Sequence, residues 1–331
     1  MDKKIDLINK ALNDLEGNLV SCSLCPRKCH VNRDKGEIGI CGVGALPVVS
    51  SYDLHFGEEP CLSGYYDYNN NKKTQSFLCG SGTVFFSGCN LKCVYCQNYQ
   101  ISWHIHGSIF SIDDLASAFL SLQKRKSLNI NLVTPTHVII PLLRALKKAF
   151  EQGLSIPLVY NTSAYDSYET VSKLNGIIDI YLPDFKYFNK NTSLRLSNAP
   201  DYPEKAADAI KEMYRQVGNL EVDDEGNAKK GLLIRHLVLP NHVDESCRIL
   251  EWIAKNLLND VSLSIMSQYY PCYKAPEDIN RRIFTEEYAT VLKKAEKLGF
   301  ENVYTQPAPF QSKDHFIPDF ESDDVFPWNH G

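Results

Sequence analysis

Three cysteines, Cys89, Cys93 and Cys96, stand close together, with three and then two residues between them. They follow a short apolar run at 83–86 that predicts a buried strand. Three thiolates on one loop can hold three irons of a cubane iron–sulfur cluster and leave the fourth iron without a protein ligand. A zinc site usually takes its ligands as two pairs, and no second pair follows at such a distance. Because a loop with this spacing follows a strand, three cysteines that merely fill a core are the weaker alternative.

A second group of cysteines lies on short loops near the N-terminus and comprises Cys22, Cys25, Cys29 and Cys41. Such a set suits a tetrahedral metal or a second iron–sulfur cluster. Thiolate softness alone does not separate zinc from iron. The alternative is that these thiols are free or form disulfides that staple the fold. Cys61 and Cys79 could approach each other, but ordinary buried thiols are the simpler interpretation.

The composition limits the classes of protein to which the chain can belong. Apolar residues make up 44% of the 331 residues, which provides a sizeable core and excludes global disorder. The formal charge of −5 comes from interspersed acidic and basic side chains, so neither nucleic acid nor a membrane is an expected partner. We expect no signal peptide, and no apolar run approaches the ~20 residues that cross a bilayer. Eleven clustered cysteines then favour metal ligation over disulfides and predict a reducing cytoplasm.

From residue 83 onward, apolar strand patterns alternate with amphipathic helical patterns. The predicted strands lie at 83–87, 129–134, 157–162, 177–182, 231–238 and 262–267. The predicted helices lie at 112–123, 137–152, 166–175, 203–217, 243–258 and 284–297. Strands rich in Val, Ile and Leu, each followed by a helix, predict an α/β fold with a parallel sheet, here a partial, TIM-like (β/α)6 barrel. In such barrels the chemistry collects at the C-terminal ends of the strands.

This pattern divides the chain into three predicted segments. Residues 1–82 are predicted to hold an N-terminal helix at 4–16, the small cysteine-rich metal-binding extension and a linker. Residues 83–305 are predicted to form the barrel, with a last strand at 302–305. Residues 306–331 are predicted to be a tail that packs on the barrel and covers its open side.

The cysteine loop resembles that of the radical S-adenosylmethionine (radical SAM) superfamily, which has this spacing and an aromatic residue, here Tyr95, before the last cysteine. From about Cys22 to the C-terminal segment, the chain is similar to relatives of the pyruvate formate-lyase activating enzyme, within a branch that carries an extra N-terminal cysteine cluster. The resemblance implies a [4Fe-4S] cluster that binds S-adenosylmethionine at its open iron. Reduced flavodoxin or ferredoxin would donate the electron that cleaves the cosubstrate to a 5′-deoxyadenosyl radical, which abstracts hydrogen from a substrate.

The resemblance also suggests side chains that contact S-adenosylmethionine. Tyr95 would pack against the adenine. Thr134 and Thr136 stand where many radical SAM enzymes carry a Gly-Gly-Glu turn that holds the methionine amino group, a pattern from which this chain departs. Thr136 could instead cap the next helix. Gln268, after the strand at 262–267, could hydrogen-bond the nucleoside or the substrate.

Strand ends further along the chain offer charged groups. Asp184 and Lys186 are similar to an aspartate and a lysine of activating enzymes, where the aspartate can bind a monovalent cation together with residues of the preceding strand. Thr162 matches that arrangement, whereas Asn161 replaces an expected aspartate. A salt bridge between Asp184 and Lys186 is the alternative. An arginine within a barrel strand, Arg235, should meet an anion, for which the methionine carboxylate or an adenosine hydroxyl is the expected partner.

Three functions compete at this stage. The activating-enzyme resemblance suggests hydrogen abstraction from a glycyl residue of a partner protein. A second enzyme hypothesis is radical modification of a small molecule or peptide, with the N-terminal cluster as an electron relay. The third is a non-catalytic iron–sulfur electron-transfer protein. Electron carriers normally ligate every iron, so three cysteines with one vacant position favour an enzyme.

Overall fold

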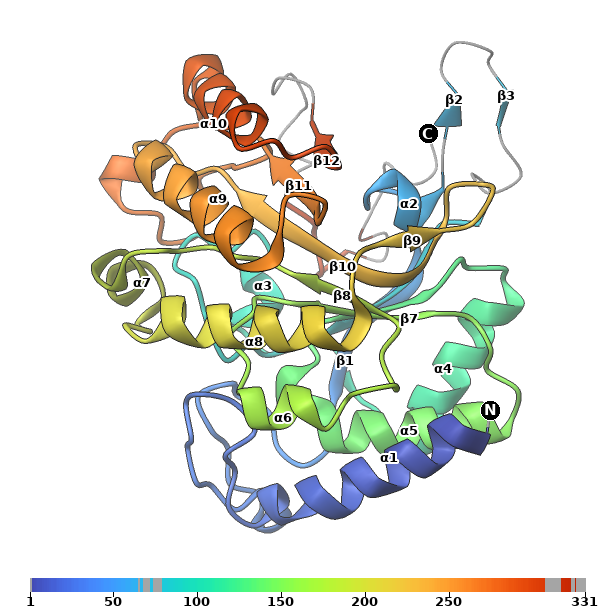
Figure 1. Cartoon of the computed structure of the whole chain (residues 1–331). Helices are drawn as coiled ribbons and strands as arrows, with labels where there is room; N and C mark the ends of the chain where they lie inside the picture. The colour runs from blue at the N-terminus through green and yellow to red at the C-terminus, as the bar shows by residue number, and fades with distance from the viewer. Residues whose placement is uncertain are drawn as a thin grey trace.

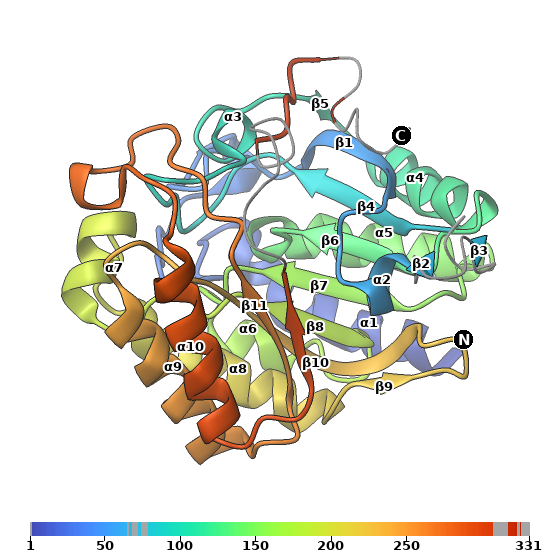
Figure 2. The same cartoon turned by 90° about the horizontal axis from the view of Figure 1, so that it is seen from above.

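A curved, open sheet organises the molecule (Figures 1 and 2). The computed structural model describes residues 2–64, 66–67, 72–73, 79–306, 317–322 and 325. The strand order is β12-β11-β10-β8-β7-β6-β4-β1-β5, with β9 paired to β10. Among the described residues the two ends of this order do not pair, so the sheet does not close into a full barrel. The α/β fold with an open, partial barrel predicted from the sequence is confirmed.

Seven strands run parallel: β4 (Ser81–Phe86), β6 (Ile130–Val133), β7 (Leu158–Thr162), β8 (Ile180–Pro183), β10 (Ala228–Leu237), β11 (Ser262–Met266) and β12 (Val303–Thr305). Every residue of β4, β8 and β11 is buried. Burial on both faces explains the continuous apolar runs, because parallel strands covered by crossover helices contact no water on either side.

The helices after these strands cover the outer side of the sheet (Figure 2). They are α4 (Ile112–Lys124), α5 (Ile139–Glu151), α6 (Tyr168–Ser172), α7 (Lys190–Ser197), α8 (Tyr202–Val217), α9 (Val243–Leu257) and α10 (Thr285–Lys297). Apolar stripes face the sheet; in α4, for example, Leu115, Phe119 and Leu122 are buried. The N-terminal helix α1 (Asp2–Leu15) lies along α5 through its buried stripe at Ile8, Leu12 and Leu15.

The predicted linker contains a strand of the main sheet. β1 (Val48–His55) pairs antiparallel with β4 over most of its length and with the short β5 (Ser108–Ile109). The predicted border at residue 82 therefore cuts through the sheet. Buried and exposed residues do not alternate regularly along β1, so its sequence indicates a strand only weakly. The remaining short elements are α2 (Pro60–Ser63), β2 (Tyr66–Asp67), β3 (Lys72–Lys73), α3 (Tyr99–Ser102) and β9 (Glu221–Val222).

The described part of the C-terminal tail contacts the barrel. The Phe320 ring packs edge-on against Phe85 of β4, with centroids 5.3 Å apart. The Phe320 backbone N–H donates to the Gln100 side chain at 2.9 Å, and the Gln100 amide donates to Asp319 at 3.1 Å. The rest of the predicted tail lies outside the described residues. In the part of the chain that the structure describes, no helix is both long and apolar enough to span a membrane.

Candidate active site

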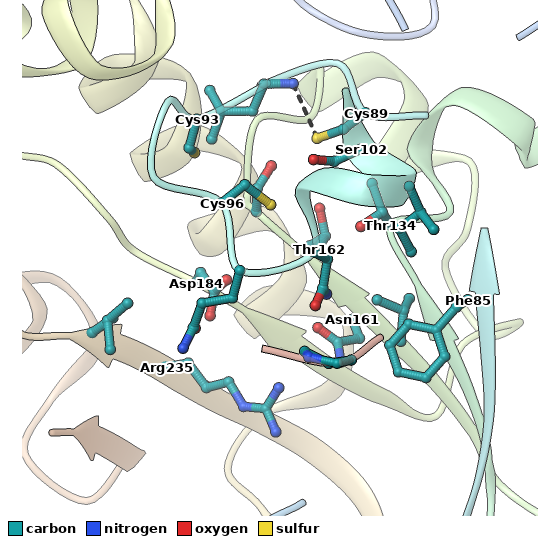
Figure 3. Close-up of a pocket in the computed structure, with 18 of the residues that line it drawn as sticks. Phe85, Cys89, Cys93, Cys96, Ser102, Thr134, Asn161, Thr162, Asp184 and Arg235 are labelled. Carbon is teal, nitrogen blue, oxygen red and sulfur yellow. Dashed lines mark hydrogen bonds between the residues drawn. The ribbon is translucent and has the colours of Figure 1, made fainter. Parts of the chain in front are cut away.

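A cavity of about 300 Å³ opens at the C-terminal ends of the strands, which is the place predicted from the barrel pattern. Its size is that of a small-molecule site. In Figure 3 the three cysteines of the cluster loop lie toward one end and Arg235 lies toward the other, with Asn161 and Thr162 between them. The predicted site residues that line it are Cys89, Cys93, Cys96, Tyr95, Thr134, Asn161, Thr162, Asp184, Arg235 and Gln268.

The cluster loop, residues 87–96, directly follows β4. Burial raises the pKa of the Cys89 thiol, and burial with the neighbouring Cys93 raises that of Cys96 to about 12. Thiols with a raised pKa lose their protons readily only beside a cation. Iron is a metal ion that thiolate ligands bind well. Among the described residues, no three potential ligands converge on a single ion. A cubane accepts each thiolate at a different iron, so separated sulfurs that face one cavity fit a cluster.

Hydrogen bonds and a glycine fix the course of this loop. The Leu91 N–H donates to the Cys89 sulfur at 3.4 Å, and the Ser197 hydroxyl donates to the Cys93 sulfur at 3.2 Å. Gly88 adopts φ +87°, and a Cβ built there would lie 2.5 Å from the carbonyl oxygen of Cys41. The residue before the first cysteine must therefore be glycine, both for its left-handed backbone and for the close approach of the N-terminal segment.

We expect Gly88→Ala to destabilise the protein by about 1–3 kcal/mol from the unfavourable φ alone, with the steric clash added. Chemical denaturation monitored by circular dichroism measures this loss. Gly17→Ala is the control, because a Cβ at Gly17 meets nothing within 4 Å. A Gly88→Ala variant as stable as Gly17→Ala would contradict the loop geometry described here.

An ion pair stands beside the cysteines. Lys186 Nζ lies 2.6 Å from Asp184 Oδ2, which is the salt bridge weighed as an alternative for this aspartate. Burial lowers the pKa of Lys186, but Asp184 and the nearby Cys93 outweigh it, and the net pKa is above the ordinary lysine value. Lys186 therefore stays protonated and places a fixed positive charge next to the thiols.

Strands β6 and β7 end in polar groups that face the cavity. Thr134 has a φ of +58°, a rare conformation for a β-branched residue, and its N–H donates to the Asn161 carbonyl at 2.8 Å. The Thr162 hydroxyl donates to Asp166 at 2.6 Å. Asp184 already has Lys186 as its counter-ion, so the cation proposed from the resemblance stays a prediction.

Thr136 does not line the cavity, and it does not cap the next helix. Its hydroxyl donates to Asp166 at 2.7 Å, and no side-chain cap begins the helical segment that contains it or α5. Tyr160 donates to the same carboxylate at 2.9 Å. Burial raises the pKa of Asp166 although these hydroxyls and Thr162 favour its charged form. Asp166, which the sequence analysis missed, therefore ties the ends of β6 and β7 together.

Arg235 meets an anion, but the anion is a pair of protein carboxylates. Its Nε donates to Glu59 Oε1 at 2.8 Å, and its Nη2 contacts both Glu58 and Glu59. These glutamates follow β1, in the segment predicted as a linker, and Glu58 also lines the cavity. The methionine carboxylate and the adenosine hydroxyl are thus not needed to explain this buried arginine. Arg235 and Leu237, two residues apart on β10, both line the cavity, as alternation along a strand requires.

Tyr95 and Gln268 are held by neighbouring side chains. The buried Tyr95 ring packs edge-on against Tyr187 and Tyr269, with centroids 6.4 and 5.7 Å away. Gln268 accepts a hydrogen bond from the Gln306 amide at 2.9 Å. The Gln268 amide nitrogen donates to the Met266 sulfur at 3.6 Å and has a second N–H for a ligand, whereas most of the Tyr95 ring is committed to aromatic packing.

The four N-terminal cysteines also come together. They line a second, smaller cavity behind the cluster loop. All eleven cysteines of the chain are described and free of disulfides.

Comparison with known proteins identifies a family. No family model matches the chain. The protein MJ0674 of Methanocaldococcus jannaschii, which has no described function, is 35% identical over 329 residues, covering 91% of this chain and 86% of that protein. The chain belongs to the MJ0674 family. A second M. jannaschii protein, MJ0808, is 23% identical over 312 residues and covers 89% of this chain and 83% of its own length.

Two solved structures are similar to this chain in fold. A radical SAM methyltransferase from Sphaerobacter thermophilus superposes with a TM-score of 0.50 at 12% identity, covering 68% of this chain and 65% of that one. Streptococcus suis SuiB bound to S-adenosylmethionine gives a TM-score of 0.47 at 14% identity, covering 66% of this chain and 48% of that one. The match thus spans less than two thirds of either solved chain. The first of these similarities shows that the chain shares its fold with that methyltransferase.

Proposed function

We propose that the protein is a radical SAM enzyme. The observation that supports this proposal best is the convergence of Cys89, Cys93 and Cys96 on one cavity at the C-terminal ends of the strands. These three thiols would hold a [4Fe-4S] cluster and leave one iron to S-adenosylmethionine. Bound there, the two groups supply one-electron cleavage of the sulfonium to a 5′-deoxyadenosyl radical that takes a hydrogen atom from the substrate.

The residues of this chain would orient the cosubstrate and balance its charge. Lys186 would offset the negative charge of the thiolates. Asp184 lines the same cavity and would place a carboxylate near the positive sulfonium. Asn161 and Gln268 offer amide groups to the methionine or nucleoside part. The Phe85 ring lines the site and would help to exclude water from it, and Phe320 packs against that ring.

We also propose that Cys22, Cys25, Cys29 and Cys41 hold a second metal or cluster. Reduced flavodoxin or ferredoxin in the cytoplasm is the proposed electron donor. The activating-enzyme resemblance makes a glycyl residue of a partner protein the first substrate to test, and a small molecule or peptide the second.

Anaerobic reconstitution with iron and sulfide, followed by dithionite and S-adenosylmethionine, tests the enzyme proposal. We expect 5′-deoxyadenosine in the chromatogram, with release that depends on both reductant and cluster. A loaded cluster that changes its absorbance on reduction but forms no 5′-deoxyadenosine would instead favour the electron-transfer function and sink the radical proposal.

A further inference from the structure

The small cavity behind the cluster loop is lined by all four N-terminal cysteines, by Leu24 and by five polar residues, of which Arg27 and Lys28 lie between the cysteines. The other three, Arg33, Asn90 and His137, come from different parts of the chain. Asn90 belongs to the cluster loop, between Cys89 and Cys93. The loop thus separates two sulfur-lined cavities, with Cys89 and Cys93 facing one and Asn90 facing the other.

Each of these three side chains has a buried polar atom without a hydrogen-bond partner in the described structure. The atoms are Arg33 Nε, Asn90 Oδ1 and His137 Nδ1, in residues that are 5%, 1% and 2% exposed. Buried polar atoms are rarely left unpaired, so three around one cavity indicate that a polar group belongs there. Thiolates bound to a metal in this cavity would give the arginine donor a negative partner.

The positive charge of Arg33 also indicates a negatively charged group in this cavity. Its Nη1 donates to the carbonyls of Gly44 at 3.1 Å and His137 at 2.8 Å, and its Nη2 lies 3.3 Å from the Cys41 sulfur. In the described part of the chain no salt bridge pairs it with a carboxylate, and the potentially anionic group that it contacts is the Cys41 thiol. A buried guanidinium needs a counter-charge, which metal-bound thiolates in the same cavity would supply.

Two residues that line this cavity, Arg27 and His137, also hydrogen-bond the cluster loop from behind. Arg27 Nε donates to the Asn90 carbonyl at 2.9 Å, and its Nη2 donates to the Leu91 carbonyl at 3.3 Å. His137 Nε2 lies 2.8 Å from the Ser87 carbonyl, at the start of the loop. Anything that orders the N-terminal cysteines therefore also orders the peptide that carries Cys89 and Cys93.

We propose that this cavity holds a metal–thiolate centre of net negative charge, that Arg33 is its counter-cation, and that loading it fixes the cluster loop. The inference rests on the metal-binding role proposed above for the four cysteines and is independent of radical chemistry. Arg33 is a positioning residue that acts on the metal through the thiolates.

The test uses the full chain with Cys89, Cys93 and Cys96 replaced by alanine, so that metal content reports the N-terminal site. Zinc alone and iron with sulfide are loaded in separate arms, and elemental analysis identifies which is retained. We expect Arg33→Gln to lose affinity by about 10–100-fold in chelator competition, as outer-shell substitutions do, and Arg33→Lys to lose less because it keeps the charge. Arg144→Gln, at an exposed ion pair with Glu16, is the charge control.

Hydrogen exchange of the peptide 87–93, followed by mass spectrometry, tests the coupling to the loop. We expect slower exchange in the loaded protein than in the same protein after chelation, and a loss of that difference in a Cys22→Ala, Cys25→Ala variant. Retention of neither zinc nor iron would overturn the metal site itself. Metal binding with unchanged affinity in Arg33→Gln, or with unchanged exchange, would overturn the counter-cation or the coupling. All of these results leave 5′-deoxyadenosine formation by the wild type as a separate test.

Discussion

A Cys93→Ala variant is expected to form no 5′-deoxyadenosine above background while it keeps the native fold. Cys93 is buried at the wall of the main cavity, and its sulfur accepts a hydrogen bond from Ser197. Removal of one of three cluster ligands should cost more than the roughly 10–100-fold in affinity that loss of an outer-shell partner costs. Iron analysis, the visible absorbance of the cluster and chromatography of the product measure the effect on the reconstituted protein.

Cys247→Ala is the matched control for this substitution. Cys247 lies half-buried in α9 and does not line the main cavity. We expect this variant to retain the iron content and product yield of the wild type. Product formation by Cys93→Ala at the level of Cys247→Ala would mean that the three thiols do not hold the catalytic cluster.

The barrel could be predicted because its signals are local. Each parallel strand is a short apolar run buried on both faces, and each long helix carries an apolar stripe of period 3.6. The predicted strand at 262–267 and the observed β11, for example, differ by one residue. The cysteine groups could be found for the same reason, since ligand spacing on one loop is itself a local pattern.

The partners of the site could not be predicted because they depend on contacts between distant segments. Arg235 and Glu59 are 176 residues apart, and a strand with an irregular burial pattern, β1, brings them together. Thr136 and Asp166 are 30 residues apart and meet only because β6 and β7 end side by side. An acidic pair directly after a strand is a signal that could have suggested an ion pair for Arg235, but many such pairs are exposed to solvent.

Arg235→Gln is expected to lower the free energy of unfolding of the metal-free protein by about 3–5 kcal/mol at neutral pH. The substitution leaves Glu58 and Glu59 buried without their cation, which is the costly way to break a buried ion pair. Their side chains are 8% and 7% exposed, so water does not replace the arginine. Urea denaturation followed by circular dichroism measures the loss. Arg144→Gln, which breaks the exposed pair with Glu16, should cost less than about 1 kcal/mol.

The pH dependence of this loss separates charge from packing. Burial raises the pKa of Glu59, but Arg235 outweighs it, so the net pKa in the wild type is lowered. The pair therefore stabilises the wild type above the ordinary glutamate pKa of about 4.3, and this stability is lost as the pH falls through the lowered value. In Arg235→Gln burial acts alone and raises the pKa, so acidification below neutral pH should narrow the gap to the wild type. Replacing both glutamates by glutamine in the Arg235→Gln background should recover part of the loss at pH 7. A gap that stays constant from pH 7 to 5 and is not reduced by the glutamine substitutions would mean that lost packing, and not uncompensated charge, destabilises the variant.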